Sequence, residues 1–104
     1  MPKLYEYLGI VIFFWSDEHE PIHVHGRYQG AEIKAEIIVE DGIITDILFK
    51  NVPGKKRFDI NKRNDFESFI RHYAKQIVDK WIDYFVWKKD IEPKIISRRV
   101  RWNL

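Results

Sequence analysis

The sequence predicts an α+β fold in which a small antiparallel sheet of about four strands, a β-meander, packs against one long helix. Two patterns support this. Between residues 22 and 50, apolar and polar residues alternate, as in strands that bury one face. From residue 64 to about residue 86, apolar and aromatic residues recur every three or four positions, as on the buried side of a helix. A chain of 104 residues suits one domain.

Four strands are expected near residues 8–15, 22–28, 32–39 and 43–50. The first has apolar side chains on both alternating faces, which is typical of a strand covered on both sides. The loop Glu40-Asp41-Gly42 is interpreted as a three-residue hairpin connection. That register opposes Val39 with Ile43 and Ile37 with Thr45, and it keeps one face of the hairpin apolar.

A second hairpin is expected at Gln29-Gly30, between residues 22–28 and 32–39. This turn would pair Arg27 with Glu32 across the two strands, a favourable pairing of opposite charges. The same register places His23 opposite Glu36.

The long helix is expected over residues 64–86, with Asn64 as its N-cap. Residues 1–90 are assigned to one α+β domain. Residues 91–104 form a basic C-terminal tail, which is expected either to add an edge strand or to stay mobile. The apolar stripe of the helix comprises Phe66, Phe69, Ile70, Tyr73, Ile77, Trp81 and Tyr84.

Composition excludes several classes of protein. The chain has no cysteine, which rules out disulfides and thiolate metal sites and favours a reducing, cytoplasmic location. The apolar run Leu8–Trp15 is far shorter than the ~20 residues that span a bilayer, so no membrane segment is expected. No glycine-rich phosphate loop and no serine in a nucleophile-elbow context is present.

Three histidines form the candidate site. His23 and His25 point to the same side of a strand, with bases roughly 7 Å apart, and His19 lies in the loop before them. Three imidazoles at one exposed spot would suit zinc or another divalent transition metal. Glu18 and Glu36 are candidate further ligands or hydrogen-bond acceptors for the imidazoles. The alternative is that these are ordinary histidines on a polar strand face.

The segment Gly9–Ile12, followed by Ser16–His25 with its Glu18-His19 and His23-Val24-His25 motifs, resembles the bacterial domain-of-unknown-function family 4160. The resemblance covers roughly residues 5–86, and Trp81 matches the tryptophan near the end of the family's helix. Ile22 replaces the second proline of the pattern, and Tyr73 stands where many members carry a helix histidine. The resemblance implies a small cytoplasmic protein, without established activity, from a toxin–antitoxin-like gene pair. It therefore implies a protein partner encoded by a neighbouring gene.

Three functions remain open. The first is a partner-binding or regulatory domain, acting on a neighbouring gene's product or as a homodimer. The second is a metal site at His19, His23 and His25, with hydrolysis as its natural chemistry. The third is nucleic-acid contact through the tail, where residues 88–104 hold six basic and two acidic residues. Nucleic acid is the least favoured partner, because the rest of the chain is net acidic. The tail residues concerned are Arg98, Arg99, Arg101 and Trp102.

Overall fold

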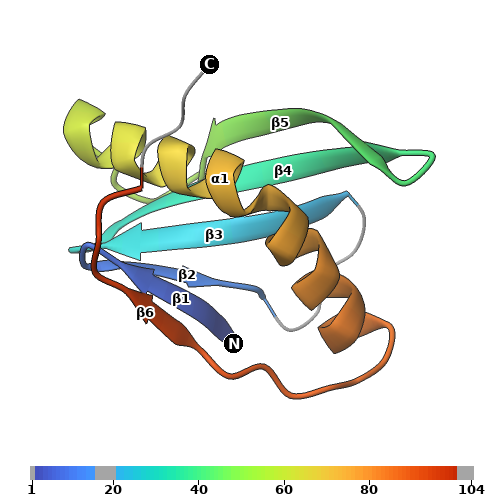
Figure 1. The fold of residues 1–104 in the computed structure, drawn as a ribbon. Coiled ribbons are helices and arrows are strands. Elements are labelled where there is room, and N and C mark those ends of the chain that lie inside the picture. The colour runs from blue at the N-terminus through green and yellow to red at the C-terminus, as the bar shows by residue number, and fades with distance from the viewer. Residues whose placement is uncertain (1, 16–20, 101–104) are drawn as a thin grey trace.

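The computed structural model describes residues 2–15 and 21–100. Strands β5-β4-β3-β2-β1-β6 form one six-stranded sheet in that order, and helix α1 crosses one of its faces (Figure 1). The α+β class is confirmed, but the sheet has six strands where about four were expected. The elements in chain order are β1 (Lys3–Tyr7), β2 (Ile10–Phe13), β3 (Ile22–Tyr28), β4 (Ala31–Glu40), β5 (Ile43–Asn51), α1 (Ile60–Phe85) and β6 (Lys94–Ile96).

The sheet is mixed because its last strand runs parallel to its first. Strands β1 to β5 form an antiparallel meander, and β6 then pairs in parallel with β1 after the chain has passed through α1. Further along the tail, the Val100 amide donates a hydrogen bond to the Tyr7 hydroxyl oxygen at 2.9 Å. For residues 94–96, the edge-strand alternative for the tail is therefore correct.

The expected strand over residues 8–15 is wrong at its start. Leu8 and Gly9 have φ values of 49° and 84° and form the tight turn between β1 and β2. Two consecutive positive φ angles give the twist that a two-residue hairpin needs, but leucine seldom adopts that conformation. Because the turn lies within an apolar run, the sequence did not indicate it. The sequence therefore did not predict strand β1 either.

The β3–β4 hairpin has the register that the sequence predicted. Arg27 pairs with Glu32 and His23 with Glu36, and the two-residue turn is Gln29-Gly30. The positive φ values of both turn residues match the hairpin geometry.

The predicted β4–β5 register is wrong. Glu40 pairs with Ile43, so the loop is the two-residue turn Asp41-Gly42, and Thr45 then forms a bulge between the pairs made by its neighbours. The extra residue shifts the rest of the strand by one position, so that Ile37 meets Ile47. The bulge therefore preserves the apolar face that the longer loop was proposed to preserve.

Helix α1 begins four residues before the expected start. Asp59 is the N-cap, and its Oδ1 accepts a hydrogen bond from the Lys62 amide at 2.9 Å, so the expected cap Asn64 lies inside the helix. The first turn is mostly polar and therefore gives no apolar periodicity. No helix in the described part of the chain is long and apolar enough to cross a bilayer. The buried helix residues are Phe66, Phe69, Ile70, Ala74, Ile77 and Trp81.

Gly26 in β3 lies directly against the Phe66 ring of α1. A Cβ atom at this position would lie 2.5 Å from Cε1 of Phe66 and 2.7 Å from its Cδ1. The Phe66 ring is itself fully buried, and the rings of Phe49 and Phe58 pack against its sides. The absence of a side chain on β3 is thus what lets α1 lie this close to the sheet.

Candidate functional site

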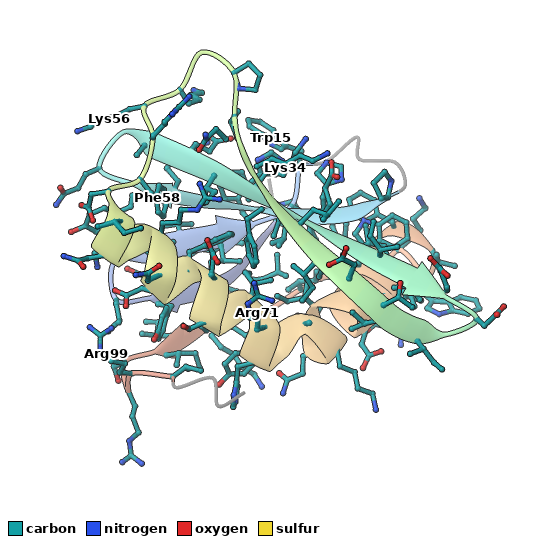
Figure 2. All side chains as sticks on the ribbon, turned by 90° about the horizontal axis from the view of Figure 1, so that it is seen from above. Trp15, Lys34, Lys56, Phe58, Arg71 and Arg99 are labelled. Carbon is teal, nitrogen blue, oxygen red and sulfur yellow. The ribbon has the colours of Figure 1, made fainter. Side chains whose placement is uncertain are left out.

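The two described histidines of the cluster lie on the sheet face that α1 does not cover. Because Ile22 and Val24 are buried in the core under the helix, strand alternation turns His23 and His25 to the opposite side. Trp15 and Lys34 lie on that same side (Figure 2). The face away from the helix therefore carries its own small aromatic and charged cluster.

His25 is buried, although the sequence predicted an exposed cluster. Only 5% of its surface is accessible. Its ring stacks on Phe13 at 5.5 Å between centroids and meets Trp15 edge-on at 5.8 Å. These aromatic neighbours come from β2 and the residues after it, which the sequence had treated only as a core strand.

A buried carboxylate, Glu32 of β4, holds His25 in place. Glu32 is 2% exposed, and its Oε2 lies 3.1 Å from Nδ1 of His25. The other carboxylate oxygen, Oε1, accepts a hydrogen bond of 3.5 Å from Nη2 of Arg27. The sequence paired Glu32 with Arg27 alone. It missed His25 because that histidine is a diagonal neighbour, two residue pairs further along the hairpin on the same face.

Both imidazoles have their Nδ1 atoms facing acceptors. Burial lowers the pKa of His25 from 6.5 to about 4, against the opposing effect of the Glu32 carboxylate, so the ring is neutral at neutral pH. Nδ1 of His23 lies 2.8 Å from the carbonyl oxygen of Pro21. Because a carboxylate and a carbonyl only accept, Nδ1 carries the hydrogen in both rings. In a neutral ring the lone pair is then on Nε2.

The spacing of the two rings fits a shared ion. Their centroids are 5.6 Å apart, with an angle of 58° between the planes. Two imidazoles bound through nitrogen at about 2.0–2.1 Å to one tetrahedral ion have centroids roughly 5–6 Å apart. Among the described residues, no group of three or more histidine or acidic side chains is placed to hold a metal. The described pair can therefore supply two nitrogens of a coordination sphere.

Glu36 lies beside His23 in the hairpin register, but its carboxylate contacts lysines. Lys50 Nζ is 2.8 Å from one oxygen, and Lys34 Nζ is 3.5 Å from the other. The hydrogen bond from Lys50 lowers the pKa of Glu36. The sequence made Glu36 a candidate acceptor of a hydrogen bond from His23. In the structure it is Glu32 that accepts one, and from His25.

Of the remaining predicted site residues, only two of the tail arginines are described. His19, Glu18, Arg101 and Trp102 lie outside the described residues. Arg98 is exposed, and Arg99 forms an ion pair with Asp65 of α1. The tail thus supplies one arginine that is tied to the helix and one that faces solvent.

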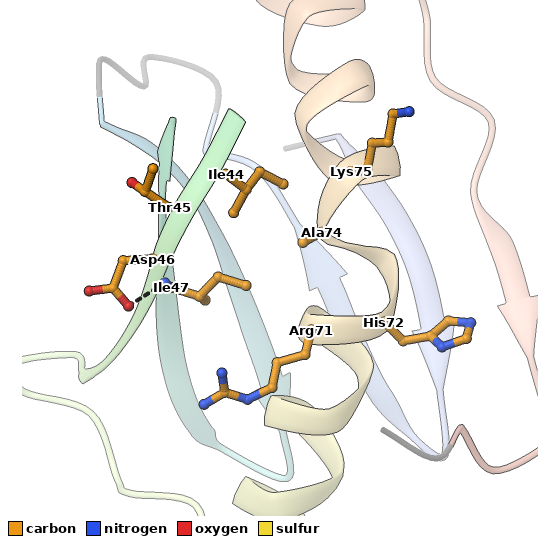
Figure 3. A pocket seen from close by; sticks show the side chains of 8 residues that line it. All are labelled: Ile44, Thr45, Asp46, Ile47, Arg71, His72, Ala74 and Lys75. Carbon is orange, nitrogen blue, oxygen red and sulfur yellow. Dashed lines mark hydrogen bonds between the residues drawn. The ribbon is translucent and has the colours of Figure 1, made fainter. Parts of the chain in front are cut away.

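A cleft of about 570 Å³ between β5 and α1 was not predicted. Ile44 and Ile47 point toward the helix, Arg71 points toward the strand, and His72 points away (Figure 3). The apolar floor of this cleft could not be recognised from the sequence, because the wrong β4–β5 register put Ile44 on the sheet face away from the helix.

The depressed pKa of His25 predicts a loss of stability in mild acid. Below pH 6.5 the unfolded chain protonates His25, while the folded protein keeps it neutral down to about pH 4. The unfolded state then binds more protons, so the free energy of unfolding should fall as the pH is lowered through this window. The neighbouring Glu32 carboxylate raises the pKa of His25, whereas His23 and Lys34 lower it together with burial.

Urea unfolding of the metal-free protein from pH 7 to pH 4, with a chelator present, measures this dependence. His25→Asn, which keeps a side-chain donor but does not titrate, should flatten the profile. The exposed His72→Asn is the matched control and should leave it unchanged. A profile equally steep in His25→Asn would assign the acid sensitivity to other groups.

Residues 9–82 match the family described as a domain of unknown function (DUF4160). No curated protein and no solved structure matches the chain. The matched segment runs from the turn before β2 to near the end of α1, and it includes both described histidines and Glu32. Because the match spans most of the sequence, the chain belongs to the DUF4160 family.

Proposed function

We propose that this domain binds a divalent transition metal, zinc by preference, through Nε2 of His23 and Nε2 of His25. One observation supports the proposal above others: both rings have Nδ1 held by an acceptor, at a centroid spacing of 5.6 Å. Metal-binding histidines are commonly oriented in this way by a carboxylate or a carbonyl on their other nitrogen.

Glu32 would act on the metal through His25. A carboxylate that accepts the Nδ1–H bond makes the opposite nitrogen a stronger donor. His19, which precedes His23 by four residues and His25 by six in the same sequence motif, is the proposed third ligand, and Glu18 is a further candidate. Water in the remaining position would give the coordination used by hydrolytic zinc sites.

Replacing both His23 and His25 by alanine removes the two proposed metal-binding nitrogens and should abolish metal binding. Calorimetric titration with zinc, nickel and manganese should give one site per chain in the parent protein and none in His23→Ala/His25→Ala. His72→Ala changes an exposed histidine on α1 and should bind like the parent. The double variant is checked by circular dichroism, since His25 is buried. Equal binding by the double variant and the parent would refute the site.

Glu32→Gln tests whether the Glu32 carboxylate orients His25 for metal binding. If it does, the variant should bind the metal more weakly than the parent protein. Glu32→Gln keeps the shape of the side chain but replaces the charged acceptor of His25 Nδ1. Loss of such partners typically lowers metal affinity about 10- to 100-fold. An unchanged affinity in a folded Glu32→Gln protein would show that the carboxylate does not support a metal ligand.

A second candidate function is a cytoplasmic partner-binding or regulatory domain of a toxin–antitoxin-like gene pair. The outer edge of β5, which no described strand covers, and the cleft beside it favour this candidate, because an exposed edge is a template for a further strand. Co-expression with the product of the neighbouring gene, followed by size-exclusion chromatography, tests it. Two separate peaks for the purified proteins would reject that partner.

A further inference from the structure

We infer that β5 pairs with β5 of a second copy of this chain, antiparallel, about a two-fold axis through Leu48. This inference deepens the partner-binding candidate and is independent of the metal site. Two six-stranded sheets would then become one continuous sheet, with both helices on the same face.

The edge formed by β5 is long and regular where the pairing is proposed. It is a nine-residue strand, whereas β6 at the other edge has three residues. Among residues 2–15 and 21–100, no strand pairs with the outer side of β5. Residues 46–50 pair with β4 without interruption, and the bulge at Thr45 lies just outside them. A new strand could therefore follow this segment without meeting the bulge.

The charges of this segment are self-complementary in one register. With Leu48 on the axis, Asp46 of each copy faces Lys50 of the other, and both side chains lie on the sheet face away from α1. Symmetry makes this opposite-charge contact twice. On the helix side, Ile47 of each copy faces Phe49 of the other, so apolar side chains meet there.

A neighbouring register lacks this match. With the axis at Ile47, Asp46 would face Leu48, and Lys50 would fall opposite Ile44, beyond the bulge at Thr45. Asp46 would then lie against an apolar side chain, and Lys50 would meet no acidic partner on its own face, because Ile44 points toward the helix. The same-face charge pattern therefore favours one antiparallel register, because opposite charges directly across a strand pair stabilise it.

The side chains concerned are accessible for pairing. Leu48 is 39% exposed, and Asp46 and Lys50 are exposed as well. The Asp46 carboxylate accepts a hydrogen bond from the adjacent Ile47 amide at 2.8 Å, and Lys50 holds Glu36. Dimer formation would turn Asp46 from this amide toward Lys50 of the second copy, while a main-chain carbonyl replaces it at the amide.

Charge reversal with complementation tests the register. Light scattering coupled to size-exclusion chromatography should give a dimer for the parent protein. Asp46→Lys places two lysines opposite each other at both contacts, and Lys50→Glu places two acids there, so each variant alone should be monomeric. An equimolar mixture restores both opposite-charge contacts and should be dimeric. Glu40→Lys, an exposed charge change near the hairpin turn, should leave the parent dimer unchanged.

Each alternative result overturns the inference. A monomeric parent at high micromolar concentration rejects the dimer, and if it still binds the neighbouring gene product, the partner-binding candidate stands without it. Dimers in both single variants, or a mixture that stays monomeric, reject this register. Lys50→Glu faces Glu36 and is checked by thermal melting. Should it not fold, Leu48→Glu, which puts like charges on the axis, replaces it and must give a monomer.

Discussion

Trp81→Ala is expected to lower the free energy of unfolding by about 3–5 kcal/mol, the usual effect of truncating a large buried aromatic side chain. Trp81 is 9% exposed and packs against Phe85 at 5.0 Å between ring centroids. It belongs to the cluster that joins α1 to the sheet. Urea unfolding at neutral pH measures the change.

Two other tryptophan variants sharpen this test. Trp87→Ala removes a side chain that is 65% exposed and should change stability little. Trp81→Phe should be milder than Trp81→Ala, because the indole N–H is buried and has no hydrogen-bond partner among the described residues. Equal unfolding midpoints for Trp81→Ala and Trp87→Ala would contradict the packing described here.

Gly26→Val is expected to destabilise the protein by about 1–3 kcal/mol or more, through overpacking instead of a cavity. Even a single Cβ at this position would lie 2.5 Å from the Phe66 ring, and that ring is enclosed by Phe49 and Phe58. The helix would have to move away from β3. Gly26→Ala should give a smaller effect of the same sign.

A second substitution distinguishes overpacking from other effects of losing a glycine. Phe66→Leu shortens the ring that meets residue 26, so Gly26→Ala/Phe66→Leu should be more stable than the sum of the single changes predicts. Exact additivity of the unfolding free energies would show that the clash at Gly26 is not the cause.

The sequence determined the β3–β4 hairpin correctly because several signals agreed there. Strict alternation, a Gln-Gly turn and the Arg27–Glu32 charge pair all indicated one register. The first hairpin offered no such agreement. Its turn places leucine at a positive φ angle inside an apolar run, and composition alone cannot distinguish that from a continuous strand.

The β4–β5 error has a different cause. The requirement for one apolar face was correct, but a bulge at Thr45 met it where a longer loop had been assumed. Bulges change the count of residues by one without a signature in composition. The consequence was large, because the positions of Ile44, Ile47 and the cleft follow from this single residue.

At the candidate site, the sequence identified the correct strand face but not its burial. Strand alternation placed His23 and His25 together, as the structure does. The burial of His25 depends on Phe13 of β2 and on Trp15, which follows that strand. The meander order placed these two strands side by side, but the contacts depend on the register that pairs Phe13 with His25, and the sequence pattern did not give that register.

The parallel pairing of β6 with β1 sets an order in which the molecule can assemble during synthesis. Each contact within the meander joins neighbours in sequence and can form as soon as its hairpin has left the ribosome. Strand β1 gains its second neighbour only after β6 has been synthesised, because Tyr7 pairs with Ile96, 89 positions later in the chain. Until then β1 presents an unpaired edge, which is a site where the nascent chain can aggregate.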